Sequence, residues 1–300
     1  MAPPTADQRV TGVPAILDYD FMQRALLAAA LVGLAAPVVG IFLVQRRLSL
    51  IGDGLGHVAL AGVAAGLLTG QAPVWTALVA AVAAAVLLET VRSRGRTSGD
   101  VVLAVIFYGG IAGGVVLISL APAGNAANLS PYLFGAITTT TATDVRIFAV
   151  LAAVLLGSAL VLRPWLFAVS NDEEYARAVG LPAQAVNIAL AVMTAVTVVL
   201  SMRTVGLLLI SALMVVPNAT AQQFAGSFRA SLATAVGIGL VASVSGVTTS
   251  YYVDVPSGGT IVLLAIAGFL LAVGVRAARD RLPGRAGTVS SGEAPPPSST

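Results

Sequence analysis

The only histidine of the chain, His57, lies four residues after Asp53 inside a long apolar segment. Residues at positions i and i+4 share one face of a helix, so the carboxylate and the imidazole would point the same way. Carboxylate oxygens and imidazole nitrogens are common ligands of divalent metals. Ionisable side chains within an apolar span mark functional sites. Asp53 and His57 therefore predict a site for a divalent cation.

Two ligands from one helix are too few for a tight metal site, because metal ions in proteins usually bind four or more ligands. Water, backbone carbonyls or a second copy of the chain about a two-fold axis would have to complete the shell. The alternative is structural, a neutral hydrogen bond between Asp53 and His57 that only locks two helices. The sequence leaves a low-affinity metal relay site and a structural hydrogen bond both open.

The composition predicts a membrane protein. Hydrophobic residues make up 57% of the sequence and charged residues only 10%, and the mean hydropathy is +0.94. The arginines, which supply every basic charge, lie beside apolar stretches, a pattern typical of membrane topology rather than of nucleic-acid binding. Because the sequence contains no cysteine, thiolate metal sites and disulfides are excluded. Harder or borderline cations such as Zn²⁺, Mn²⁺ and Fe²⁺ remain.

Most of the apolar stretches approach the ~20 residues that a helix needs to span lipid. The stretches lie at 22–45, 48–69, 74–91, 101–120, 147–168, 184–202, 205–221, 231–250 and 260–275. We therefore expect an all-α, polytopic membrane protein with about eight to nine transmembrane helices. The weakest stretch contains Gly206, Pro217 and Asn218, which favour a short or broken helix that lines a pathway. A plain proline-kinked span is the alternative.

The arginines predict the topology, because basic residues collect on the cytoplasmic side. The residues assigned to that side are Arg46, Arg47, Arg92, Arg94, Arg96, Arg163, Arg177, Arg229, Arg276, Arg279 and Arg281. This assignment places the carboxyl end inside the cell and, after nine spans, the amino end outside. The segments 1–20 and 277–300 lack apolar periodicity and are expected to be disordered tails. The membrane domain is then predicted over 21–276.

A polar segment on the predicted cytoplasmic side carries the start and stop signals of a short helix. Asn171 or Asp172 can cap its amino end, and Glu173 and Glu174 suit the positive end of the helix dipole. Gly180 supplies a left-handed exit, and Pro182 prevents continuation. Such a helix suits the docking of a partner, and a stabilised cytoplasmic turn is the alternative.

Five patches, in order along the chain, resemble the integral-membrane permeases of zinc, manganese or iron importers of the ATP-binding-cassette type, a family that includes the zinc permease of bacteria. The likeness covers nearly all of 21–275. The patches are Arg46 and Arg47 followed by Gly52, Asp53 and His57; 132–135; 172–181; 205–208 leading to Pro217; and 254–258.

The resemblance implies a permease subunit in a bacterial cell membrane, present as a homodimer or a paired heterodimer. Its partners would be a separate ATPase subunit and an extracytoplasmic metal-binding protein. Asp53 and His57 fall on the family's pathway metal position, and the cargo would be a divalent ion, with zinc preferred over manganese and iron. No permanently bound cofactor is implied. The coupling helix that docks the ATPase falls on Asp172, Glu173, Glu174, Ala176, Val179 and Gly180.

Gly54 and Gly56 depart from the family pattern, where larger or hydroxylated residues are usual. Each glycine lowers helix propensity by roughly 1 kcal/mol. We therefore expect the helix to be interrupted beside Asp53, with carbonyls exposed as extra ligands.

The chain has neither a lysine nor a Gly-x-x-x-x-Gly-Lys-Ser/Thr loop, so it cannot bind ATP through a phosphate loop of its own. We therefore expect a transport subunit rather than an enzyme. The main alternative is a proton-coupled metal carrier in which Asp53 alternates between protonated and metal-bound forms. A remote alternative is an intramembrane hydrolase that uses His57 as a base for Ser211 or Ser245.

Overall fold

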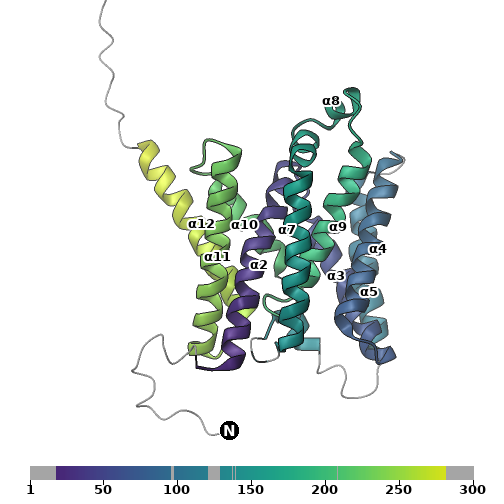
Figure 1. Ribbon diagram of the computed structural model, residues 1–300, viewed down its shortest axis with the longest axis vertical. Helices are drawn as coiled ribbons and strands as arrows, with labels where there is room; N and C mark the ends of the chain where they lie inside the picture. Colours follow the sequence, from purple (N-terminus) through teal and green to yellow (C-terminus); the bar gives the residue numbers. More distant parts are fainter. Residues whose placement is uncertain are drawn as a thin grey trace, which may run out of the picture.

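The structure is a computed structural model that describes residues 18–95, 98–120, 129–136, 138, 140–207 and 209–281 (Figure 1). In this part of the chain, 8 helices are long and apolar enough to cross a membrane. They are α2 (Asp20–Gln45), α3 (Ile51–Thr69), α4 (Pro73–Ser93), α5 (Gly99–Ser119), α7 (Ala142–Asn171), α9 (Ala183–Ser201), α11 (Phe228–Val253) and α12 (Ser257–Arg281). The shorter ones are α6 (Ser130–Phe134), α8 (Glu173–Ala178) and α10 (Ile210–Ala221). The prediction of an all-α polytopic membrane protein is confirmed.

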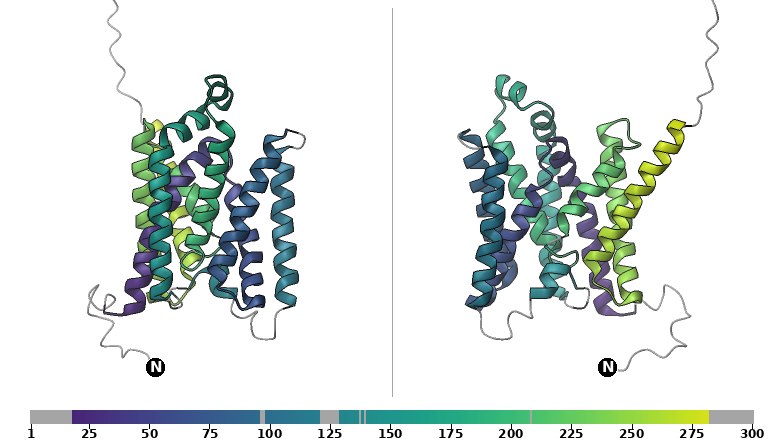
Figure 2. Two further views of the ribbon diagram at one scale, coloured as in Figure 1. Left: turned by 45° about the vertical axis from the view of Figure 1, so that its right-hand side comes forward. Right: turned by 180° about the vertical axis from the view of Figure 1, so that it is seen from behind.

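The long helices stand side by side (Figures 1 and 2). Consecutive ones alternate in direction, except that α9 and α11 run the same way because α10 lies between them in the chain. Helix α3 packs on α4 and α5 at one side of the bundle, and α2 packs on α7, α10 and α11 at the other. Helix α9 joins the two groups through contacts with α2, α3, α4 and α7. The short helix α8 projects from one end of the bundle, and α6 lies at the opposite end (Figure 1).

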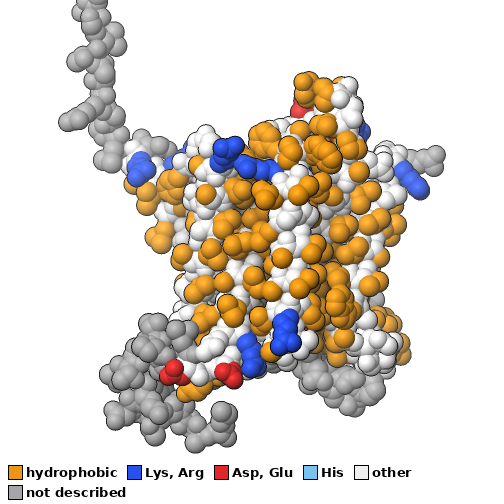
Figure 3. All heavy atoms as spheres, viewed as in Figure 1, with side chains coloured by type: hydrophobic (Ala, Val, Ile, Leu, Met, Phe, Trp, Pro, Cys, Tyr) orange, Lys and Arg blue, Asp and Glu red, His pale blue; other side chains and the backbone are white. Residues whose placement is uncertain are grey.

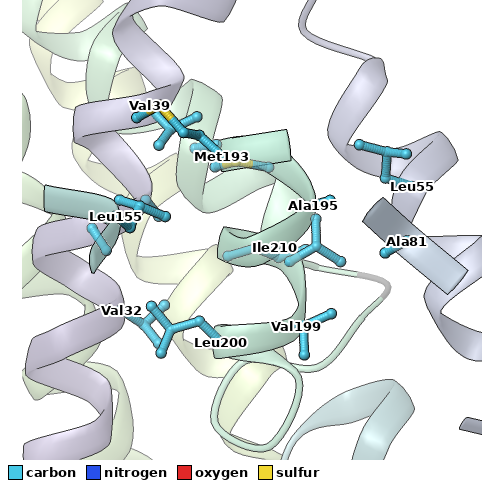
Figure 4. Packing of buried hydrophobic residues seen from close by; sticks show 14 of the residues in the cluster. Val32, Val39, Leu55, Ala81, Leu155, Met193, Ala195, Val199, Leu200 and Ile210 are labelled. Carbon is cyan, nitrogen blue, oxygen red and sulfur yellow. The ribbon is translucent and has the colours of Figure 1, made fainter. Parts of the chain in front are cut away.

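Helix α9 forms the centre of the apolar core (Figure 4). Met193, Ala195, Val199 and Leu200 are buried on several of its faces, as expected for a helix that is hydrophobic all round. In the most hydrophobic 18-residue segment of α9, 67% of the residues are buried, whereas the share is 17% in α5 and 22% in α12. The apolar side chains exposed on the outer helices form a belt suited to lipid, and charged side chains lie near its two edges (Figure 3).

Helix α10 is short, as the sequence predicts for 205–221, but it starts only at Ile210 and continues without a break through Pro217. Its 12 residues span about 18 Å, well short of a bilayer core of about 30 Å. The chain before it, 202–207, forms turns rather than a membrane-spanning helix. The ninth crossing is therefore made by a half-length helix and a compact turn.

The prediction that α3 is interrupted at Gly54 and Gly56 is wrong, because the helix is continuous from Ile51 to Thr69. A Cβ on Gly56 would lie 2.8 Å from the carbonyl oxygen of Leu207, and a Cβ on Gly54 would lie 2.7 Å from Leu103. Small residues at these positions let α3 approach its neighbours closely. Packing, rather than helix breaking, accounts for both glycines.

The two terminal helices extend slightly beyond the predicted membrane domain 21–276. Helix α2 already begins at Asp20, inside the predicted tail 1–20. Helix α12 continues to Arg281, past the predicted end of the membrane domain at 276. The remainder of the two predicted tails, 1–17 and 282–300, lies outside the described residues.

Replacing Gly258 with alanine is expected to destabilise the protein, whereas the same change at Gly259 is not. A Cβ on Gly258 would lie 1.8 Å from the carbonyl oxygen of Val205, and nothing lies within 4 Å of a Cβ on Gly259. We expect a loss of about 3 kcal/mol for G258A, at the upper end of overpacking effects, and less than about 0.5 kcal/mol for G259A. Thermal unfolding in detergent measures both. Equal midpoints for the two variants would show that α12 does not press on the 202–207 turn.

Candidate functional site

Asp53 and His57 lie on the first two turns of α3, and both side chains are half-buried. No hydrogen bond or ion pair to any described residue involves the Asp53 carboxylate. The structural alternative, a hydrogen bond between Asp53 and His57, is therefore not formed in this structure. One chain also lacks a group of three or more acidic, histidine or cysteine side chains able to hold a metal, as far as its residues are described. Asp53 and His57 alone would therefore not complete the coordination shell of a metal ion.

Helix α5 holds the imidazole of His57 in place. The ring of Phe107 meets it edge-on, with ring centroids 4.5 Å apart. Gly110 brings the two helices together, because a Cβ there would lie 2.8 Å from the backbone carbon of His57. The Nδ1 atom is buried and has no hydrogen-bond partner among the described residues. Leaving such an atom unpaired costs about 1–3 kcal/mol, which keeps His57 a candidate ligand.

Helix α10 brings a further oxygen close to this part of α3. A Cβ on Gly52 would lie 3.0 Å from the hydroxyl oxygen of Ser211. That oxygen is buried and has no hydrogen-bond partner among the described residues. The sequence pattern did not mark Ser211 as a possible ligand, because its only signal is a hydroxyl on a segment of uncertain secondary structure. Its place beside Gly52, the residue before Asp53, adds it to the candidate site.

The predicted helix over 172–180 is present as α8. The Asp172 side chain accepts a hydrogen bond of 2.9 Å from the backbone N–H of Tyr175. Of the two predicted caps, Asp172 is therefore the one that is used, whereas Asn171 ends α7. Gly180 has a φ of +86°, as expected for the residue that ends the helix. Ala176 is buried, whereas Tyr175 and Val179 are exposed. Helix α8 projects from the bundle (Figure 2), and its exposed side chains include both apolar and charged ones.

A buried arginine links α8 to the end of α2. Arg46 donates hydrogen bonds to the side chains of Asn187 and Glu173, and its side chain is 6% exposed. Asn187 also donates to Glu173 over 3.1 Å, and Arg177 pairs with the same carboxylate. Burial lowers the pKa of the Arg46 guanidinium from its usual value, and the Glu173 carboxylate opposes that shift.

This cluster lies between the two candidate sites, the docking helix α8 and the Asp53/His57 pair on α3. The next helix after Arg46 is α3, which carries Asp53 and His57 and begins at Ile51. The Arg46 cluster therefore lies only the short connection 47–50 away from the helix that carries the predicted metal ligands. From the sequence, Arg46 is recognised only as part of a family pattern and as a topology signal. Its role in this cluster could not be predicted, because its partners lie 127 and 141 residues away along the chain.

Comparison with known proteins decides the family, because residues 18–276 match the ABC 3 transport family. The chain belongs to that family. As an ABC 3 permease it is a transport subunit and not an enzyme. Ser245, named above for the hydrolase alternative, donates to the carbonyl of Val241 on its own helix.

Relatives of this permease are similar over nearly their whole length. The manganese transport system membrane protein MntC of Halalkalibacterium halodurans is 31% identical over 258 residues, which cover 86% of this chain and 88% of that protein. The chelated iron transport system membrane protein YfeD of Yersinia pestis is 30% identical, with 85% of each chain covered. The solved structure of PsaBC from Streptococcus pneumoniae in complex with Fab is 30% identical. It has a TM-score of 0.78 and covers 86% of this chain and 93% of that chain.

The residues predicted to form a broken-helix pathway occupy packing positions in this ABC 3 permease. Asn218 is fully buried, and its amide donates to the carbonyls of Pro37 (3.0 Å) and Met214 (2.8 Å), which ties α10 to α2. Gly206 has a φ of +86°, and a Cβ there would lie 2.3 Å from the carbonyl oxygen of Leu133. Pro217 lies within α10. That these residues line a pathway stays a prediction.

At the end of the permease opposite α8, polar contacts hold the 202–207 turn in place. Arg203 lies 3.6 Å from the carboxylate of Asp144 and donates to the hydroxyl of Tyr132 over 3.0 Å. Burial raises the pKa of Tyr132, and the charge of Arg203 opposes that shift. Ser257 donates to the carbonyl of Thr204 over 2.7 Å. The turn is thus held between α6, α7 and the start of α12.

Proposed function

We propose that this chain is the membrane permease subunit of an ATP-driven importer for a divalent transition metal. The observation that carries the proposal is the unpartnered pair on α3: a carboxylate without a counter-charge and a buried imidazole nitrogen without a hydrogen bond. Asp53 and His57 are the proposed ligands of the transported ion. Family membership and the names of the relatives support a metal as cargo.

Manganese is the cargo that we propose first. Relatives named for manganese or chelated iron are 30–31% identical to this chain, and the zinc preference inferred from resemblance is not confirmed by them. A site of carboxylate, imidazole and water ligands suits Mn²⁺ and Fe²⁺ as well as Zn²⁺. Selectivity among these ions is set by geometry and delivery rather than by affinity alone.

A second copy of the chain is proposed to complete the metal site. Each chain supplies one carboxylate and one imidazole, so a two-fold axis beside α3 would bring together four ligands from the same two positions. This arrangement explains why the described part of a single chain contains no complete metal-binding group. A homodimer is therefore part of the proposal.

Energy for transport is proposed to come from a separate ATPase that docks on α8. The chain has no lysine and so no phosphate-binding loop. A proton-coupled carrier is less well supported, because most such carriers would use a further acidic residue within the membrane. The buried carboxylate of Glu89 on α4 is already paired with Arg92 over 3.3 Å. An extracytoplasmic metal-binding protein would deliver the ion at the end that carries α6.

The end that carries α8 is proposed to face the cytoplasm of a bacterial cell. Arginines that terminate helices, among them Arg46, Arg92 and Arg94, lie at this end, in agreement with the positive-inside rule. The C-terminal end of α12 lies at the same end of the bundle, and the start of α2 lies at the other (Figure 1). The carboxyl end is then cytoplasmic.

The metal content of cells tests the proposed function. Cells that lack this chain are complemented with the wild-type gene or an empty vector, grown under metal limitation, and measured by mass spectrometry for all transition metals. We expect manganese to recover only with the wild-type chain. Recovery of iron or zinc instead would change the cargo but keep the transport function. Recovery of no metal would contradict the proposal.

Removing the aromatic ring of Tyr175 is expected to weaken docking of the ATPase without unfolding the permease. Tyr175 is 66% exposed at the tip of α8, and buried aromatic anchors in interfaces contribute about 2 kcal/mol or more. Association of purified permease with its ATPase should therefore weaken at least about 30-fold in Y175A. Tyr252, 58% exposed at the other end of the bundle, provides the matched control. Equal affinities of Y175A and Y252A would place the docking surface elsewhere.

A further inference from the structure

A cavity of about 400 Å³ opens between α7 and α11 at the end of the bundle that carries α8. Its lining residues are Arg163, Pro164, Phe167, Phe228 and Arg229. It is separate from the α3 site and from the docking helix, and neither of those sites uses any of its residues.

The floor of the cavity is aromatic and firmly packed. The rings of Phe167 and Phe228 meet edge-on with centroids 4.9 Å apart. Behind them, the buried Phe42 of α2 lies 5.7 Å from Phe228. The guanidinium of Arg163 lies 5.8 Å from the centroid of the Phe228 ring, within reach of a cation–π contact. This contact fixes one positive charge over an apolar surface.

The positive charge of the cavity is not neutralised by the protein. Arg163 is half-buried and Arg229 is exposed, and neither forms an ion pair or hydrogen bond with a described residue. No acidic residue is among those that line the cavity. Helix α11 begins at Phe228, so the positive end of its dipole adds to the same field. The cavity is therefore built for an anion.

The combination of two arginines with an aromatic floor selects the kind of anion. Basic side chains gather at the upper edge of the apolar face formed by α7 and α11 (Figure 3). We propose that this cavity binds the phosphate group of an anionic phospholipid, such as phosphatidylglycerol, from the leaflet on the α8 side. The guanidinium groups hold the phosphate, and the acyl chains lie against the exposed apolar side chains of α7 and α11, such as Leu160 and Val241. A free phosphate ion could also bind the guanidinium groups, but it has no acyl chains to contact the apolar surface.

Native mass spectrometry of the permease in complex with its ATPase tests the proposal. The complex is titrated in detergent with phosphatidylglycerol, phosphatidylcholine or inorganic phosphate. We expect retention of phosphatidylglycerol by the wild type, and roughly 10- to 30-fold weaker retention in the double variant R163Q/R229Q. The matched control is R94Q/R279Q, which removes two exposed arginines from the same end that do not line the cavity. It should retain the lipid as the wild type does.

Two outcomes would overturn the proposal. One is equal retention of phosphatidylglycerol by R163Q/R229Q and the wild type. The other is wild-type binding of phosphatidylcholine or inorganic phosphate as tight as that of phosphatidylglycerol. Hydrogen exchange of the wild-type complex provides a readout that needs no variant: phosphatidylglycerol should protect the backbone at 163–167 and 228–230. Absence of that protection would likewise contradict the site.

Discussion

Replacing Asp53 or His57 with alanine is expected to abolish metal uptake while leaving the permease folded. Loss of a partner that only orients a metal ligand costs 10- to 100-fold in affinity, so loss of a ligand itself should lower uptake by at least about 100-fold. Stability should not fall in D53A, because the described residues give this carboxylate no partner to lose. Uptake per molecule of membrane-inserted permease, measured with thermal unfolding, checks both expectations.

The matched controls separate a ligand from a packing residue. His57→Phe keeps the edge contact with Phe107, which is worth about 0.5–1.5 kcal/mol, yet removes both nitrogens. It should therefore unfold at a temperature no lower than that of the wild type and still fail to transport. Asp100→Asn removes an exposed carboxylate from the first turn of α5 and should transport normally. Normal uptake by His57→Phe would show that the ring is only a packing element.

Replacing Arg46 with alanine is expected both to destabilise the permease and to uncouple it from its ATPase. The change removes the donor to the Asn187 side-chain oxygen and one of the three donors to Glu173, which keeps Arg177 and Asn187. Breaking a fully buried ion pair costs 3–5 kcal/mol. Because the Glu173 side chain is 26% exposed, we expect about 2–3 kcal/mol, or a decrease of roughly 5–10 °C in the unfolding midpoint. ATP hydrolysis by the assembled complex should continue while metal uptake falls.

Arg177 provides the control for Arg46, because it pairs with the same carboxylate from the surface. Its side chain is 57% exposed, and exposed ion pairs contribute only about 0–1 kcal/mol. R177A should therefore behave nearly as the wild type. Arg46→Lys retains the charge but loses the forked geometry that reaches both partners, so intermediate stability is expected. Indistinguishable R46A and R177A variants would remove the proposed link between α8 and α3.

The helices themselves could be predicted from the sequence because membrane spans and helix ends have local signals. Hydrophobic length marked the eight long helices, and Asp172 with Gly180 marked both ends of α8. The prediction that α10 is short followed from the polar residues around Pro217. These features depend on residues near one another in the chain.

The contacts between helices could not be predicted, because they depend on residues far apart in the sequence. Gly54 and Gly56 weaken a helix by propensity alone, yet α3 is continuous because Leu103 and the carbonyl of Leu207 pack against them. Tertiary packing overrides propensity in such cases. The partners of Arg46 and the position of Ser211 beside α3 required the folded structure for the same reason.

The measurement that tests the central claim most directly is pulsed electron paramagnetic resonance of Mn²⁺ bound to the purified permease. His57 is the only histidine of the chain, so a preparation without a histidine tag contains no other imidazole that could coordinate the ion. We predict nitrogen modulation of the Mn²⁺ signal in the wild type and its loss in His57→Phe. Bound Mn²⁺ without nitrogen modulation in the wild type, or unchanged modulation in His57→Phe, would contradict the assignment of His57 as a ligand.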